Sequence, residues 1–350
     1  MRTDLRVGII GAGGIAKLRH VDAWLSLADR GVRVVAVADI DALRAQTVAG
    51  RVGGAQVFTD YRDLLALDEI DAVDIITPTG VHKEQSVAAL EAGKHVICEK
   101  PMCMDEAEGQ AIIEAAGRTG KKFMVTQHHR FPLPAQAARR LVESGRLGEV
   151  YHVRCHALRR RLLPAAPTFI YKKNSGGGPL LDIGVHILDL AMFLMGFPKP
   201  VLVMGSTMTK LAHREDIINE WGDWDRKGID VEDFAAGIVR FDNGATLVLE
   251  TSWLLNMDAR DDFSLRLFGT EAGLYFPEMV LYSQLDGAIA DTKIGGVTDP
   301  VFAHTRAIQA FYNCIVSDLP SPVPADQNID VLRVLWALYQ SSQSGREVRL

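Results

Sequence analysis

Short apolar segments alternate with segments of helical periodicity over the first 126 residues. The apolar segments, interpreted as strands, lie near 5–10, 32–37, 56–59, 72–76, 95–98 and 122–126. Asp41, Asp60 and Asp105 stand where the intervening helices would begin. Gly93 and Gly120 stand where two of them would end. Because strands that alternate with helices form a parallel sheet covered on both faces, residues 1–127 are predicted to form a doubly wound α/β domain.

The pattern changes after residue 127. A helix is predicted near 134–144 and a strand near 149–157, followed by a loop rich in proline and basic residues. Alternating apolar and polar positions then flank the turn signal Asp242-Asn243-Gly244, which is typical of antiparallel strands. The further predicted strands lie near 234–241, 245–253, 264–268 and 280–283, and the further helices near 304–317 and 327–344. Residues 128–350 are therefore predicted to form an α+β domain with a large open, mainly antiparallel sheet. Substrate or another subunit typically covers such an open face, and we expect a homodimer or homotetramer formed through this sheet.

A glycine-rich loop follows the first strand, as Gly11-Ala12-Gly13-Gly14-Ile15-Ala16. Gly11 suits the tight turn, Gly13 allows the backbone to approach a pyrophosphate, and Ala16 lets the next helix pack closely on the strand. The helix N-terminus would supply free N–H groups and partial positive charge for the phosphates. Asp39, at the end of the second strand, is suited to the adenosine ribose. Its carboxylate would repel a 2′-phosphate, so NAD is predicted in preference to NADP.

Composition and charge narrow the function further. The chain has 350 residues, of which 48% are hydrophobic, and a formal net charge of -6. This charge provides no broad cationic surface, so neither nucleic acid nor a membrane is expected as a partner. The cysteines, which are Cys98, Cys103, Cys155 and Cys314, are scattered without metal-ligand spacing. We therefore predict a cytoplasmic protein without a metal site.

Polar residues follow three of the predicted parallel strands. They are Thr77-Pro78 with His82, then Glu99-Lys100-Pro101, and then Gln127-His128-His129-Arg130. Ligands of open α/β sheets bind beyond the carboxyl ends of the strands, so these residues are candidates for the site. The alternative for Glu99 and Lys100 is a solvated loop pair.

A second candidate cluster begins with Gly176-Gly177-Gly178 and continues into an apolar helix. Asp182, His186 and Asp189 recur on that helix at spacings of four and three residues, which predicts one shared face. A carboxylate beside His186 would orient the imidazole as a general base. The alternative is a histidine whose hydrogen bonds are satisfied within the core.

Together, the glycine loop, Glu99-Lys100-Pro101 and the glycine run followed by Asp182-x-x-x-His186 resemble the Gfo/Idh/MocA family, named for glucose-fructose oxidoreductase, inositol dehydrogenase and rhizopine catabolism. The resemblance implies a Rossmann domain, a C-terminal sheet domain, and hydride transfer between a nicotinamide and a secondary carbon of a sugar or cyclitol. It also implies catalytic roles for Lys100, Asp182 and His186. The predicted cofactor-binding residues are Gly11, Gly13, Gly14, Ile15, Ala16, Asp39, Thr77, Pro78, His82, Glu99, Lys100 and Gln127. The predicted substrate-binding residues are Lys100, His129, Arg130, Arg159, Arg160, Asp182, His186 and Trp224.

Two segments depart from the pattern of the family, the first where the nicotinamide contacts are expected. Many members of the family carry an asparagine within the segment matching 127–131, where this chain has two histidines. Residues 215–233, which include Trp221 and Trp224, are either a solvated loop or a cap over the substrate. The arginines at 154 and 159–161 suit a sugar nucleotide, whereas the acidic residues of 215–233 suit an aminosugar or aminocyclitol.

Two alternative functions remain beside the dehydrogenase. Some relatives oxidise a sugar transiently with tightly held NAD and cleave a glycosidic bond, which leaves no net NADH. The other alternative is a non-catalytic protein that binds NAD.

Overall fold

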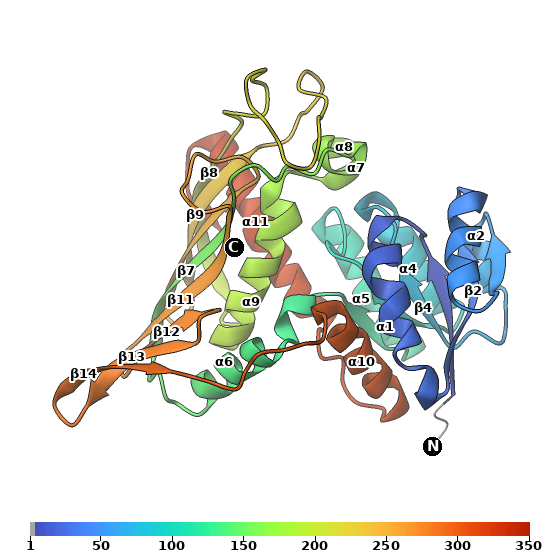
Figure 1. Cartoon of the computed structure of the whole chain (residues 1–350), viewed down its shortest axis with the longest axis horizontal. Coiled ribbons are helices and arrows are strands. Elements are labelled where there is room, and N and C mark those ends of the chain that lie inside the picture. The colour runs from blue at the N-terminus through green and yellow to red at the C-terminus, as the bar shows by residue number, and fades with distance from the viewer. Residues whose placement is uncertain (1–3) are drawn as a thin grey trace. The chain divides into compact units, whose positions relative to one another are not determined.

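The computed structural model describes residues 4–350 and divides the chain into two compact units (Figure 1). The first unit combines Met1–His128 with Val301–Ile329, and the second combines His129–Pro300 with Asp330–Leu350. Residues 301–329, which the sequence pattern assigns to the second domain, thus group with the first unit. This segment carries the helix α10 (Ala303–Val316), whose apolar face is buried in that unit.

A six-stranded parallel sheet forms the centre of the first unit, in the order β3-β2-β1-β4-β5-β6. Its strands are β1 (Leu5–Ile10), β2 (Val32–Ala38), β3 (Gln56–Phe58), β4 (Ala72–Ile75), β5 (His95–Cys98) and β6 (Phe123–Val125). These strands lie where the apolar segments predict them. The strand order reverses between β1 and β4, and ligands of such sheets bind at the carboxyl ends beside this reversal.

Helices connect these strands, and three of them begin at the predicted capping residues. They are α1 (Val21–Leu25), α2 (Ala42–Arg51), α3 (Tyr61–Leu65), α4 (His82–Glu91) and α5 (Glu106–Thr119). The carboxylates of Asp41, Asp60 and Asp105 accept hydrogen bonds from backbone N–H groups of the first turns of α2, α3 and α5. Gly120 ends α5 with a positive φ of 66°. The predicted α/β architecture of the first unit is confirmed.

A nine-stranded sheet forms the second unit, in the order β14-β13-β12-β11-β7-β10-β9-β8-β15. Its strands are β7 (Val150–Arg159), β8 (Pro200–Met208), β9 (Phe234–Phe241), β10 (Thr246–Ser252), β11 (Asp261–Gly269), β12 (Gly273–Phe276), β13 (Val280–Leu285), β14 (Ala288–Lys293) and β15 (Val348–Arg349). All neighbours are antiparallel except β7 and β10, which are parallel. The predicted, mainly antiparallel sheet is confirmed.

Helices cover one face of this sheet (Figure 1). They include α6 (Leu133–Glu143), α9 (Val185–Met195) and α11 (Ala325–Ser344), while the short α7 (Pro167–Ile170) and α8 (Lys172–Ser175) precede α9. Among the described residues, only the stretch Lys172–Met195, which comprises α8, the glycine run, a π-helical turn and α9, is long and apolar enough to cross a membrane. Its apolar window is 83% buried inside the protein, which is typical of a core helix.

The other sheet face carries exposed apolar side chains. Met204, Ile238 and Val248 are paired in register across β8, β9 and β10, and the row continues to Arg154 on β7. Met204 is 51% exposed and Ile238 is 42% exposed. Side chains alternate between the two faces of a sheet along each strand. This row therefore lies on the face opposite the one that carries the buried side chains.

Candidate active site

The glycine loop connects β1 to the first helical turn of the first unit, Ala16–His20. Gly11 has a φ of 101°, and a Cβ at this position would lie 2.6 Å from the carbonyl oxygen of Ile76. A Cβ on Gly13 or Gly14 would instead meet no atom within 4 Å. The loop thus needs glycine for its turn and leaves open space above its backbone, which fits a dinucleotide phosphate at a helix N-terminus.

Asp39 is attached to this loop. Its Oδ2 accepts a hydrogen bond of 2.7 Å from the Ala12 N–H, and its Oδ1 accepts one of 2.9 Å from the Asp41 N–H. The neighbouring Ile40 is 95% exposed and provides no cation for a 2′-phosphate. The carboxylate is therefore held at the end of β2, beside the loop whose phosphate-binding role the sequence predicts.

The residues after β4 form a fixed turn. The Thr77 hydroxyl donates a hydrogen bond of 2.6 Å to the Gln85 side chain, and Pro78 precedes a short 3₁₀ turn. His82 is 1% exposed, and its two ring nitrogens each lie 2.7 Å from a carbonyl oxygen, of Pro101 and of Thr77. The sequence predicts that His82 contacts the cofactor. In the structure, both of its ring nitrogens instead bond to carbonyl groups and join two loops.

Glu99 is buried at the end of β5, which excludes the solvated loop pair. Its Oε1 lies 3.1 Å from Nε2 of His20, and Nδ1 of the same ring lies 2.8 Å from Oδ2 of Asp74. Trp24 donates a further hydrogen bond of 2.7 Å to Asp74. Glu99 therefore belongs to a buried ionic network, and this network fixes the backbone from which Lys100 projects.

The charges within this network are set by its geometry. Burial opposes the charged form of His20, but the Asp74 and Glu99 carboxylates outweigh it and raise its pKa to about 10. Burial also opposes ionisation of Glu99, yet the His20 cation lowers its pKa to about 2. The His20 ring thus lies between the side chains of Asp74 and Glu99, and Glu99 directly precedes Lys100 in the chain.

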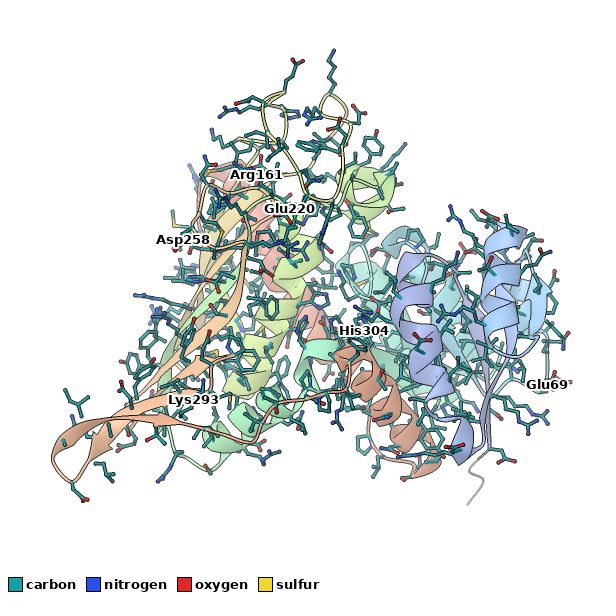
Figure 2. All side chains as sticks on the ribbon, in the orientation of Figure 1. Glu69, Arg161, Glu220, Asp258, Lys293 and His304 are labelled. Carbon is teal, nitrogen blue, oxygen red and sulfur yellow. The ribbon has the colours of Figure 1, made fainter. Side chains whose placement is uncertain are left out.

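His304, labelled in Figure 2, and His128 lie next to this network according to their ring contacts. Their rings stack with centroids 3.7 Å apart, and His304 also meets the edge of the His20 ring at 5.6 Å. Burial lowers the pKa of His304 to about 4, so this ring is neutral at physiological pH. Gln127, which precedes His128 in the chain, is buried. Its side-chain amide donates a hydrogen bond of 3.2 Å to the side-chain oxygen of Asn328.

The glycine run of the second unit is held by Glu232. Its carboxylate accepts hydrogen bonds of 3.0 Å from the Gly178 N–H and 3.1 Å from the Leu180 N–H, and one of 2.8 Å from the Tyr339 hydroxyl. A Cβ on Gly178 would collide with Glu232, and one on Gly177 would collide with Tyr339. These contacts fix the start of the π-helical turn Leu180–Gly184, which leads directly into α9.

Asp182 lies in this π-helical turn and His186 lies in the first turn of α9. The Trp253 indole N–H donates a hydrogen bond of 3.1 Å to Oδ2 of Asp182, and Nη1 of Arg159 lies 3.6 Å from the same oxygen. The His186 ring meets the edge of the His129 ring at 5.1 Å, and His129 stacks on Phe263 at 4.4 Å. The second unit thus positions a carboxylate, two imidazoles and a guanidinium among the predicted substrate ligands.

Two predicted substrate ligands have other roles in the structure. Arg130 is 2% exposed and forms a two-pronged ion pair with Asp189, with nitrogen to oxygen distances of 2.7 and 2.6 Å. Asp189 is therefore a partner of Arg130 and not of the catalytic pair. Trp224 is 6% exposed, and its indole N–H donates to the Ala212 carbonyl at 2.9 Å. The structure therefore argues against substrate contacts by Arg130 and Trp224.

The remaining predicted basic residues lie at the loop end of the sheet. Arg160 is exposed, and Arg161 donates hydrogen bonds to Leu255 and Asn256. Arg161 and Glu220 lie close together in Figure 2, and the Glu220 N–H donates to the Arg161 carbonyl at 3.0 Å. Most carboxylates of residues 215–233 are engaged by partners within the protein. Asp225, for example, accepts hydrogen bonds from the Tyr171 hydroxyl and from the Lys227 and Gly228 N–H groups.

Sequence reasoning missed His20, Asp74, His304 and Trp253. Asp74 was detectable, because a carboxylate within the otherwise apolar strand 72–76 requires a buried partner. His20 and His304 carry no such signal, because they lie 284 positions apart and meet only through the fold.

Comparisons with known proteins identify the family to which the two domains are similar. Residues 5–127 match the model described as "Oxidoreductase family, NAD-binding Rossmann fold", and residues 135–275 match "GFO/IDH/MocA C-terminal domain". A D-glucoside 3-dehydrogenase of Escherichia coli (strain K12) is 34% identical over 348 residues, which cover 99% of this chain and 98% of that protein. An inositol 2-dehydrogenase of Rhizobium meliloti (strain 1021) is 36% identical over 221 residues, 63% of each protein.

A solved structure of a levoglucosan dehydrogenase in complex with NADH and levoglucosan is similar in fold. Its TM-score is 0.84 at 25% identity, with 99% of each chain covered. The first unit of the present chain is an NAD-binding Rossmann domain, as the glycine loop and Asp39 predict.

Proposed function

Because the chain belongs to the GFO/IDH/MocA family of oxidoreductases, we propose that it oxidises a secondary ring hydroxyl of a sugar, or reduces the corresponding ketone, with NAD. Relatives named as glucoside and inositol dehydrogenases support a pyranoside or cyclitol as the substrate class. The observation that carries the proposal is the position of Asp182 and His186 on successive turns of one helical segment. Trp253 and Arg159 hold Asp182 there, and the His129 ring packs against His186.

In the proposed reaction, NAD supplies the hydride acceptor. His186 takes the proton of the reacting hydroxyl as general base. Lys100 donates a hydrogen bond to the same oxygen and stabilises the developing alkoxide. Asp182 orients a substrate hydroxyl, since its own position is fixed by the Trp253 N–H. We propose that Lys100 acts on the same substrate as Asp182 of the π-helical turn and His186 of α9.

The proposed preference is NAD over NADP. Asp39 provides a carboxylate for the ribose 2′-hydroxyl and repels a 2′-phosphate. We propose further that the protein works in the cytoplasm as a homo-oligomer. The exposed row of Met204 and Ile238 on the uncovered sheet face supports an interface through that sheet.

The test is a screen of monosaccharides, methyl glycosides, cyclitols and sugar nucleotides, followed by NADH absorbance. We expect NADH formation with at least one pyranoside or cyclitol. His186→Asn and Lys100→Met should each lower kcat about 10²- to 10⁴-fold while NAD still binds. His152→Asn, which changes a histidine of β7, is the matched control and should retain activity. Undiminished turnover in both site variants would contradict the assignment, and glycoside cleavage without net NADH would favour the alternative reaction.

A further inference from the structure

We propose that Trp221 and Arg159 form a subsite for the second ring of a glycoside, beside the ring that is oxidised. This inference rests on the proposed function and specifies its substrate class as a glycoside with a ring-shaped aglycone or a second sugar. Trp221 is 48% exposed, whereas the other tryptophan of residues 215–233, Trp224, is 6% exposed. Of the two tryptophans in this segment, only Trp221 is thus exposed enough to contact a ligand.

Arg159 connects the indole to the catalytic carboxylate. Its guanidinium carbon lies 4.9 Å from the centroid of the Trp221 ring, and its Nη1 lies 3.6 Å from Oδ2 of Asp182. One guanidinium group, which is smaller than a pyranose ring, therefore separates the indole from Asp182. A sugar ring held at Asp182 would place the group attached to it within reach of Trp221.

The segment around Trp221 is anchored on its N-terminal side. The Asn219 side chain accepts a hydrogen bond from the Leu163 N–H and donates to the Leu163 carbonyl, both at 2.9 Å. It also donates to the Gly222 carbonyl at 2.8 Å, across the residue that carries the indole. Glu220 pairs with Arg260 at 2.8 Å. The segment that carries the Trp221 indole is therefore held in place before a ligand binds, which reduces the entropy lost on binding.

The chemistry of this surface suits a sugar better than a phosphate. An indole presents a negative face to the polarised C–H groups of a pyranose, and the Arg159 N–H groups can donate to ring or hydroxyl oxygens. Arg159 already faces Asp182, so its charge is partly neutralised for an anion. The Arg161 guanidinium already donates hydrogen bonds to the Leu255 carbonyl and to the Asn256 side chain. We therefore assign the subsite to a neutral ring and not to a nucleotide diphosphate.

The experiment compares Trp221→Ala and Trp221→Phe with wild type, using glucose, methyl glucoside, cellobiose and maltose in the presence of NAD. We expect Trp221→Ala to lower kcat/KM for the preferred disaccharide about 5- to 20-fold, mainly through KM, and to change the value for the one-ring substrates less than about twofold. Trp221→Phe keeps an aromatic face and should recover most of the loss. Ile218→Ala, which alters an exposed apolar residue of the same segment, is the matched control.

Two results would overturn the subsite while leaving the proposed function intact. They are equal losses for one-ring and two-ring substrates, and an unchanged disaccharide KM in Trp221→Ala. If wild type oxidises none of these four sugars, the wider screen described above decides the proposed function, and calorimetric titration of cellobiose and maltose tests the subsite by itself. Binding that disappears in Trp221→Ala but not in Ile218→Ala would support it, and absence of wild-type binding would refute it.

Discussion

Nδ1 of His20 lies 2.8 Å from Oδ2 of Asp74, and both side chains are fully buried. Asp74 comes from β4, in the middle of the parallel sheet, where burial of a carboxylate without a cation is costly. The second ring nitrogen of His20 reaches Glu99, the residue before Lys100. The first unit therefore uses one imidazolium to stabilise two buried carboxylates, one of them next to the predicted catalytic lysine.

Replacement of His20 by glutamine should destabilise the protein by about 3–5 kcal/mol, the usual cost of removing one partner from a buried ion pair. Asp74 and Glu99 would then remain buried without the cation that balances them. The measurement is urea denaturation followed by circular dichroism. Arg62→Gln, which removes the exposed ion pair with Glu84, is the matched control and should leave the free energy of unfolding nearly unchanged. A His20→Gln protein as stable as the control would contradict the ionic role of His20.

The same network should make stability depend on pH in the alkaline range. The pKa of His20 is raised from 6.5 to about 10, so its stabilising contribution is complete below pH 6.5 and decreases as the pH rises towards 10. The difference in free energy of unfolding between wild type and His20→Gln should therefore shrink between pH 6.5 and 10. Denaturation curves at several pH values check this. A difference that stays constant over the range would show that His20 contributes by packing alone.

The sequence predicts the elements of both units better than the partners of their polar residues. The strand 72–76 and the cap Asp105 follow from local patterns, because apolar runs and capping side chains act over a few residues. The pairing of Arg130 with Asp189 does not, since it depends on how α9 packs beside the segment after β6. Burial likewise distinguishes Trp221 from Trp224, although both lie in the same polar segment. Elements and residues that depend on local spacing can therefore be predicted from the sequence. Pairs of residues that meet only in the folded protein cannot.

Arg130→Met should cost about 3–5 kcal/mol, because it leaves the Asp189 carboxylate buried without its guanidinium. Burial already raises the pKa of Asp189, despite the Arg130 cation. The double variant Arg130→Met/Asp189→Leu removes both charges and should recover most of the lost stability. Thermal and urea unfolding of the three proteins give the comparison. If Arg130 instead bound substrate, the double variant would lose substrate affinity, whereas a structural pair predicts a near-normal KM for it.

The exposed sheet face should be the interface of the proposed homo-oligomer. Met204→Lys and Ile238→Lys place charges on paired positions of β8 and β9, so together they should dissociate the assembly. Light scattering coupled to size-exclusion chromatography measures the mass directly. Leu43→Lys alters an apolar residue of α2 that is 72% exposed and should leave the mass unchanged. A monomeric wild-type protein would contradict the interface.

The carboxylate of Asp39 should determine which cofactor is used. Asp39→Asn retains an oxygen that can accept from the Ala12 N–H but removes the charge that repels a 2′-phosphate, so the ratio of kcat/KM for NAD to that for NADP should fall about 10- to 100-fold. Asp39→Ala also removes the hydrogen bond to the glycine loop and should in addition raise KM for NAD. Asp41→Asn removes a charge two residues away and keeps a capping side chain on α2, so it should change the ratio less than about threefold. If Asp41→Asn shifts the preference as strongly as Asp39→Asn, the discrimination comes from the general negative charge of this loop. A shift confined to Asp39 instead indicates direct contact with the ribose, because only its oxygens are tied to the glycine loop.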